Sequence, residues 1–212
     1  MSNLTKVTRK ELDNLIKIKG NIRDIDVSNV TDMSYMFKDI NFNDWKDQSL
    51  CDITGWDTSK VKDMSFMFAG AESIYTIRFR ISNWNTSKVR DMSFMFSGSK
   101  SFNQPIGDWD VGKVKDMSFM FAGAESFNQP IIGWNVGKVK NMRGMFAGAE
   151  SFNQPIIGWN VSKVKDMSYM FNGAKSFNQL IIGWNIGKVK NMRGMFRYAK
   201  SFNQPISWLV EY

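Results

Sequence analysis

Hydrophobic and polar residues along this chain follow a pattern that repeats every 25 residues over most of its length. Five tryptophans keep this interval: Trp84, Trp109, Trp134, Trp159 and Trp184. The apolar segment VxDMSxMF occurs seven times, with copies that end at Phe37, Phe68, Phe96, Phe121, Phe146, Phe171 and Phe196. A fixed period of this size is typical of solenoid proteins, in which one coil cannot bury its apolar face alone. The sequence therefore predicts an α/β repeat solenoid of about seven coils.

Within each coil the spacing predicts two short elements. Apolar residues at i, i+3, i+6 and i+7 fall on one face of a helix, as at Val114, Met117, Met120 and Phe121. Asp116 is the expected N-cap of this helical turn, and Gly123 lies near its C-terminal end. Residues 127–136 are richer in β-forming residues and contain a proline, which predicts a short extended segment with a bend. Stacked coils would pair these segments in a narrow parallel sheet with rungs ~4.8 Å apart.

The pattern divides the chain into an N-terminal capping helix, irregular repeats with insertions, regular repeats and an apolar tail, at residues 1–22, 23–83, 84–206 and 207–212. The helix is predicted because Thr8 and Glu11 are spaced as a capping box and an apolar stripe follows them. Extra residues occur near 45–53 and 74–80. Insertions of this kind map to loops on one edge of a solenoid.

The composition excludes several classes of chemistry. The 212 residues include no histidine and one cysteine, Cys51. The absence of histidine excludes Ser-His-Asp and Cys-His nucleophiles and every histidine-ligated zinc or iron site. A single cysteine excludes an intrachain disulfide and a thiolate metal cage. We therefore predict that the protein is not an enzyme and binds no cofactor or metal.

An acidic residue recurs at one position of the repeats, at Asp32, Asp63, Asp91, Asp116 and Asp166. A column of carboxylates could hold a metal, but Asn141 and Asn191 occupy the same position in two repeats. Asp and Asn cap helices about equally well, whereas only Asp would bring a charge to a metal. Capping is therefore the favoured interpretation.

Asn-Gln pairs also recur, beginning at Asn103, Asn128, Asn153, Asn178 and Asn203. They could form a recognition stripe, but we favour an internal ladder in which the asparagines satisfy backbone groups at a bend, and we leave the glutamines open. Methionine and aromatic side chains are expected mainly in the core, where flexible thioethers fill gaps. Tyr198 and Trp208 break the pattern and are the aromatic residues expected at the surface.

Basic residues give the clearest functional signal. Two columns two residues apart, joined by three arginines, form the candidate site: Lys88, Arg90, Lys113, Lys115, Lys138, Lys140, Arg143, Lys163, Lys165, Lys188, Lys190, Arg193 and Arg197. Residues 1–83 contain 12 basic and 12 acidic groups, whereas residues 84–212 contain 16 and 8, so the regular repeats carry the whole net charge of +8. The functional interpretation is a stripe for an acidic partner, and the alternative is a solvated face.

The C-terminal end is the second candidate surface. No polar cap follows the apolar tail, and the bare end of a solenoid is prone to edge pairing. We predict that Tyr198, Trp208, Leu209 and Tyr212 lie in an interface, either with a second copy or with another subunit of a larger assembly.

Several motifs resemble those of a known family: IDVSNVTDMSYMF at 25–37, WDTSKVKDMSFMF at 56–68, SFNQPIxxW in the later repeats and ELDNLIKIKG at 11–20. The chain resembles, over essentially its whole length, the bacterial surface-protein 26-residue repeat, also known from mycoplasma-type lipoproteins of unknown function. That group is related in pattern to BspA-like leucine-rich repeats. The resemblance implies a leucine-rich-repeat-like solenoid used for adhesion or protein interaction, without catalytic residues.

These features favour a non-enzymatic repeat scaffold for protein–protein interaction, acting as a structural subunit of a larger assembly such as a minor capsid protein of a large DNA virus. The alternatives are a cell-surface adhesin and a protein that binds nucleic acid through the basic columns. Residues 1–20 contain no apolar run typical of a signal peptide, and no stretch of about 18 apolar residues could span a membrane. We expect an intracellular or virion location, with the cell surface as the alternative.

Overall fold

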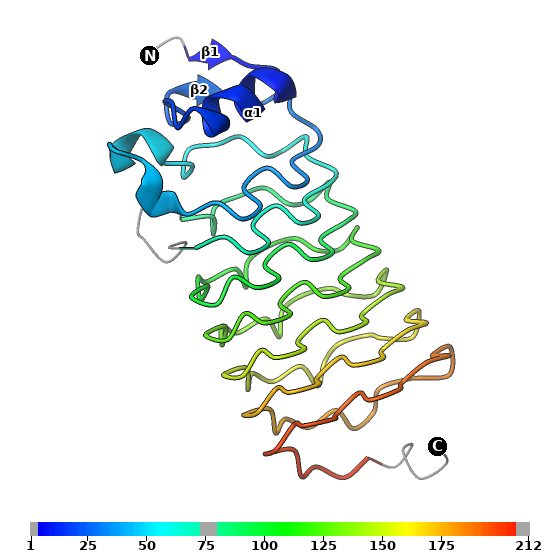
Figure 1. Cartoon of the computed structure of the whole chain (residues 1–212). Coiled ribbons are helices and arrows are strands. Elements are labelled where there is room, and N and C mark those ends of the chain that lie inside the picture. Colours follow the sequence, from blue (N-terminus) through cyan, green and yellow to red (C-terminus); the bar gives the residue numbers. More distant parts are fainter. Residues whose placement is uncertain (1–3, 73–79, 207–212) are drawn as a thin grey trace.

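The repeats lie one beneath another along the length of the molecule (Figure 1). The computed structural model describes residues 4–72 and 80–206. Isolated parallel β-bridges join the same position of consecutive repeats: Asp32 to Asp63, Asp63 to Asp91, Asp91 to Asp116, Asp116 to Asn141, Asn141 to Asp166 and Asp166 to Asn191. The 25-residue period of the sequence therefore corresponds to one backbone-bonded layer of this stack. The solenoid class itself stays a prediction.

Helices and strands are confined to the N-terminal part of the described chain. Strand β1 (Thr5–Lys6) pairs in parallel with β2 (Ile25–Asp26). Helix α1 (Arg9–Lys17) lies at the N-terminal end of the stack (Figure 1), with two buried side chains on its apolar face. The insertion near residues 45–53 contains the short 3₁₀-helix η2 (Gln48–Cys51), and a second one, η1 (Phe42–Asp44), directly precedes it. Most of the second insertion, residues 73–79, lies outside the described residues.

The predicted capping box is confirmed at the start of α1. The Thr8 side chain accepts from the Glu11 backbone N–H, and the Thr8 backbone N–H donates to Glu11 Oε2 at 2.7 Å. This bond from the Thr8 backbone and the one from its hydroxyl hold the pKa of the Glu11 carboxyl below its usual value. The N-terminus of α1 is therefore capped by residues of its own first turn.

The predicted helical turn at residues 116–121 is wrong, and consecutive β-turns stand there instead. Met120 N–H donates to Met117 O, three residues back, and Phe119 has a left-handed φ of 55° that a right-handed helix excludes. The alternate N–H groups donate to the next repeat, as from Met117 to Asn141 O at 3.0 Å. The backbone forms these bonds between repeats in place of intrahelical ones. We call residues 115–123 and their equivalents in the other repeats the turn segment.

The predicted extended segment at residues 127–136 does not form a sheet. Among the described residues the only strands are β1 and β2, and residues 131–134 make a turn in which Trp134 N–H donates to Ile131 O. Parallel bridges between repeats occur at the acidic position of the turn segment instead. At residues 127–136 and their equivalents, consecutive repeats are connected mainly by side-chain hydrogen bonds, which the Asn-Gln pairs form from one repeat to the next.

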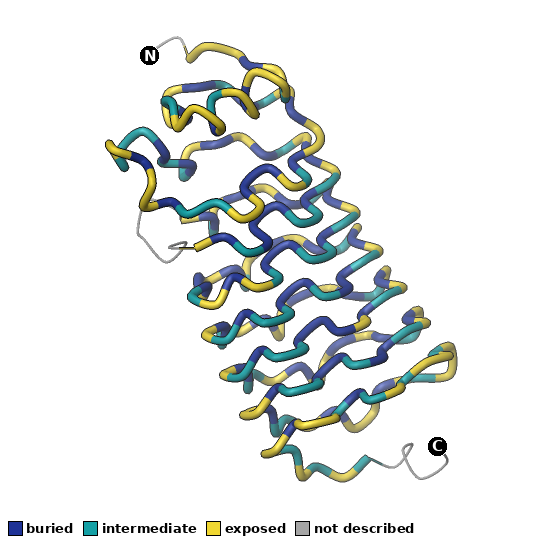
Figure 2. The backbone as a smooth tube through the Cα atoms, in the orientation of Figure 1, coloured by how far each residue is buried: buried dark blue, intermediate teal, exposed yellow. Residues whose placement is uncertain are grey.

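Aromatic and methionine side chains fill the interior, as predicted. Buried positions recur along each repeat (Figure 2), and Phe121, Met117 and Met120 have no exposed surface. The Phe121 ring stacks on Phe96 at 5.7 Å and on Phe146 at 5.6 Å between centroids. Tryptophan N–H groups also bridge repeats, since each donates to a backbone carbonyl of the preceding one: Trp84 to Ile53, Trp109 to Ile81, Trp134 to Ile106, Trp159 to Ile131 and Trp184 to Ile156.

Gly123→Ala should destabilise the protein by about 1–2 kcal/mol, because Gly123 has a φ of +69° that an alanine adopts only with strain. Gly133→Ala is the matched control, since its φ is not positive and an added Cβ would meet no atom within 4 Å. We expect the control to change the free energy of unfolding by less than about 0.5 kcal/mol. Urea unfolding measures both, and equal losses would contradict the strain argument.

Candidate interaction surfaces

The two basic columns lie on one corner of the stack, at a turn between two faces of each repeat. Val139 N–H donates to Val136 O at 2.9 Å to close this turn. Val139 is buried, whereas Lys138 and Lys140 on either side of it are exposed. The same arrangement exposes all ten members of the basic corner: Lys88, Arg90, Lys113, Lys115, Lys138, Lys140, Lys163, Lys165, Lys188 and Lys190.

Backbone hydrogen bonds keep the second basic column in register. Lys140 N–H donates to Lys115 O at 2.8 Å, and Lys165 N–H donates to Lys140 O at 2.8 Å. Chains paired in this way lie ~4.8 Å apart. The spacing of the backbone positions that carry these basic side chains is therefore fixed along the stack.

The basic corner carries unneutralised charge. Within residues 84–206, the ion pairs of the described chain are Lys100–Glu125 at 3.1 Å and Lys175–Glu150 at 2.6 Å, and neither involves the corner. Like charges ~5 Å apart repel by about 0.8 kcal/mol in water, and salt reduces this repulsion. A row of such charges attracts an anionic surface, because an anion relieves the repulsion while it gains its own attraction.

The acidic column has a structural role, although it does not cap a helix. Asp116 Oδ1 accepts from Ser118 N–H at 2.8 Å, and Asn141 Oδ1 accepts from Arg143 N–H at 3.1 Å. Both residues therefore stabilise the start of a β-turn with the same oxygen. Asn141 Nδ2 also donates to Asp116 Oδ2 at 3.1 Å, which joins two repeats. This shared bonding explains why Asp and Asn alternate in the column.

The Asn-Gln pairs form the internal ladder favoured from the sequence. Asn128 Oδ1 accepts from Asn153 N–H and from Gln154 Nε2, both at 3.0 Å. The glutamines, which the sequence left open, therefore belong to the ladder. The same three-atom motif recurs in the following repeats, with Asn153 as the acceptor for Asn178 and Gln179.

The three arginines lie on the turn segments and not on the basic corner. The guanidinium of Arg143 lies over the Phe119 ring, 5.6 Å from its centroid. Arg193 occupies the equivalent position two repeats later and is exposed. Arg197 lies 4.7 Å from the centroid of the Tyr198 ring and donates to the Tyr198 hydroxyl at 2.8 Å. The structure therefore divides the predicted basic site into two surfaces.

An aromatic column on the outside of the turn segments was missed, because these residues were assigned to the core. Neighbouring rings stack at 4.5, 4.4 and 4.7 Å between centroids in the order Tyr35, Phe66, Phe94 and Phe119. Tyr35 is exposed and the other three are half-buried. The column stops at Gly144, where an added Cβ would clash with the Phe119 ring. The sequence contained a sign of this column, because the second variable position of VxDMSxMF is always an aromatic residue or a glycine.

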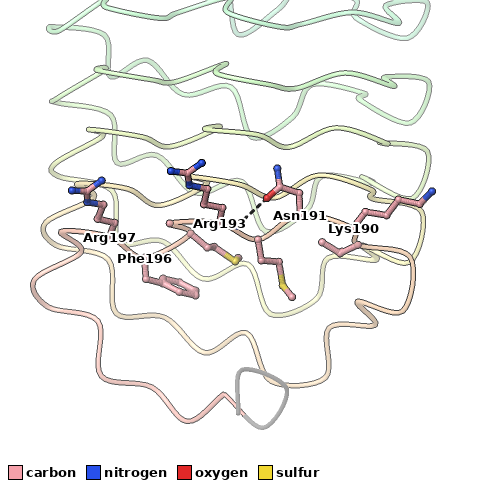
Figure 3. Close-up of a pocket in the computed structure, with 9 residues that line it drawn as sticks. Lys190, Asn191, Arg193, Phe196 and Arg197 are labelled. Carbon is pink, nitrogen blue, oxygen red and sulfur yellow. Dashed lines mark hydrogen bonds between the residues drawn. The ribbon is translucent and has the colours of Figure 1, made fainter. Parts of the chain in front are cut away.

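The C-terminal end of the stack contains a hollow of about 660 Å³, lined by residues 189–197. Figure 3 shows Lys190, Arg193 and Arg197 around it, with Phe196 at its side. Tyr198 is 63% exposed, in agreement with the surface position predicted for it. Trp208, Leu209 and Tyr212 lie outside the described residues.

Residues 4–72 and 80–206 contain no group of three or more Cys, Asp and Glu side chains that could hold a metal ion. In the same residues, α1 is far too short and polar to cross a bilayer, and no other helix is longer. Cys51 is buried.

Comparison with known proteins gives one family. The sequence-family model described as "Mycoplasma protein of unknown function, DUF285" matches three overlapping regions of the chain, residues 2–73, 41–147 and 130–211. Together these matches cover nearly the whole chain. No curated protein and no solved structure matches it.

Proposed function

The chain belongs to the DUF285 family of Mycoplasma proteins of unknown function, and from this premise we propose that it is a non-enzymatic repeat scaffold that binds an acidic protein surface. The observation that carries the proposal is the basic corner, where ten cationic side chains are exposed and none forms an ion pair within the described residues. A protein partner with a matching acidic surface would neutralise them.

The proposed architecture is a leucine-rich-repeat-like solenoid. Backbone bridges between consecutive repeats and continuous columns of buried rings support it, because both make a stiff stack whose surface charges keep their spacing. A stiff array can gain affinity from many weak contacts. Because its backbone is already ordered, binding costs little conformational entropy apart from that of the basic side chains. The proposed role of such a stiff scaffold is that of a structural subunit in a larger assembly.

Lys113→Glu, Lys115→Glu, Lys138→Glu and Lys140→Glu together should weaken binding to poly-L-glutamate by at least about tenfold, or ~1.4 kcal/mol. Binding by the unchanged protein should fall as salt rises, since the screening length shortens from ~10 Å at 0.1 M to ~3 Å at 1 M. Titration of the labelled polymer followed by fluorescence anisotropy measures both effects.

The matched control reverses four exposed lysines outside the basic corner, at Lys10, Lys17, Lys46 and Lys200. Its net charge equals that of the corner variant, so it should lose less than about threefold in affinity if position matters. Equal losses in the two variants would show that net charge alone is responsible. Binding to duplex DNA at salt concentrations where poly-L-glutamate no longer binds would favour the nucleic-acid alternative instead.

A further inference from the structure

The N-terminal end of the stack is closed by an arginine. Arg9 of α1 donates from Nη1 to Asp32 O at 2.9 Å and from Nη2 to Ser34 O at 2.7 Å. In the next repeat the equivalent carbonyls, of Asp63 and Ser65, accept N–H groups from the repeat before. Arg9 therefore takes the place of a preceding layer, and the apolar face of α1 covers the core at that end.

The C-terminal end has no such closure within the described residues. In the repeat before it, four alternate N–H groups donate to the last one: Met167 to Asn191 O, Tyr169 to Arg193 O, Phe171 to Met195 O and Gly173 to Arg197 O. The equivalent N–H groups of the last turn segment belong to Met192, Gly194, Phe196 and Tyr198. They meet no acceptor among the described residues. We call residues 189–198 the open edge.

The core is also uncovered at the open edge. Val164, Met167 and Phe171 are fully buried, whereas their equivalents Val189, Met192 and Phe196 are only half-buried. The lower end of the stack in Figure 2 accordingly changes from buried to intermediate and exposed positions. The hollow beside Phe196 in Figure 3 is the space that one further layer would occupy.

We propose that the open edge binds an extended, acidic segment of a partner polypeptide, which pairs with it as one additional parallel layer. The four N–H donors fall on alternate residues, and in the preceding repeat the same row of donors meets the carbonyl oxygens of residues 191, 193, 195 and 197. A segment that presents carbonyl oxygens on alternate residues, as an extended chain does, can pair with the open edge. Unpaired backbone donors beside an apolar surface favour such a segment strongly, because burial of the surface without acceptors would be costly.

A second copy of this chain does not fit the open edge. The complementary row of acceptors is at the N-terminal end, where Arg9 already occupies two of them, Asp32 O and Ser34 O. Two open edges placed face to face would bring donors opposite donors. The occupant is therefore a segment of another kind.

Charge selects the chemistry of that segment. Arg193 and Arg197 are exposed residues of the open edge whose guanidinium groups lie on the side of the preceding repeats in Figure 3, and neither forms an ion pair within the described residues. The acidic column also ends in a neutral residue, because Asn191 stands where the preceding repeat has Asp166. A segment with apolar side chains towards Met192 and Phe196 and carboxylates towards the arginines satisfies both features.

Amide hydrogen exchange of the 212-residue chain tests the proposal directly, with a synthetic peptide of alternating valine and glutamate as the probe. Binding should slow exchange at Met192, Gly194 and Phe196 by at least about tenfold, because these amides gain acceptors. Exchange at Met167 and Phe171 should already be slow without the peptide. A valine–lysine peptide of the same length should give no protection.

Arg193→Glu with Arg197→Glu should weaken binding of the acidic peptide by about tenfold, as expected for the loss of two exposed charge pairs. Arg143→Glu is the control, since it changes the same column inside the stack and should alter affinity by less than about twofold. Three results would overturn the proposal. They are absence of peptide-induced protection, protection that rises with protein concentration alone, and protection in the free chain that is lost on truncation after Ile206. The second result would assign the edge to a second copy, and the third to residues 207–212 of the chain itself.

Discussion

Phe121→Ala should lower the free energy of unfolding by about 3–5 kcal/mol. The Phe121 ring has no exposed surface and stacks on the rings of the repeats on both sides, 5.7 Å from Phe96 and 5.6 Å from Phe146. It also stacks on Phe127 of its own repeat, at 4.0 Å. Removal of the ring therefore leaves a cavity that touches two interfaces between repeats.

Phe196→Ala is the control from the same column. Phe196 is half-buried and stacks on Phe171 at 5.6 Å and Phe202 at 4.1 Å, and no described repeat lies beyond it. Because it stabilises one interface between repeats, we expect a smaller loss of about 1–2 kcal/mol. Urea unfolding followed by circular dichroism gives the comparison. Losses of equal size would mean that stability does not depend on contacts between neighbouring repeats.

Asn153→Ala should cost about 1–3 kcal/mol, because it leaves two donors of the next repeat without their acceptor. Asn153 Oδ1 accepts from Asn178 N–H and from Gln179 Nε2, both at 2.9 Å. The substitution removes this oxygen and little apolar surface. Thermal and urea unfolding should both shift to lower midpoints.

Two further variants separate the hydrogen bonds from other effects of the change. Asn203→Ala removes a side-chain oxygen that accepts no bond from the described residues, so the loss should be less than about 0.5 kcal/mol. Asn153→Asp keeps an oxygen in place for both donors and should retain most of the stability. If Asn153→Asp were as unstable as Asn153→Ala, acceptance of these bonds would not be the role of the side chain.

Much of the interior could be predicted from the spacing of residue types. Methionine, phenylalanine and tryptophan recur at a constant interval, and most of these side chains are buried in columns. The capping box could also be predicted, because Thr8 and Glu11 satisfy each other within one helical turn. In both cases the pattern in the chain already contains the interacting groups.

The turn segment shows why the rest could not be predicted. Apolar residues at i, i+3 and i+7 fit one face of a helix, but Phe119 at a φ of 55° makes consecutive β-turns with an equally buried set of side chains. The choice depends on acceptors in the next repeat, such as Arg143 O for the Phe119 N–H. Those acceptors are absent from any local window of sequence.

The period, the residues that fill the core and the exposed basic columns can all be derived from the amino-acid sequence, because each depends on which residue type recurs at a given position. The position of the arginines apart from these columns, the row of aromatic rings outside the core, and the closure of one end by Arg9 follow from the tertiary structure alone. The same holds for the open edge, whose N–H groups meet no acceptor in residues 4–72 and 80–206. These features depend on the direction of individual N–H and C=O groups. That direction is set only when one repeat lies against the next.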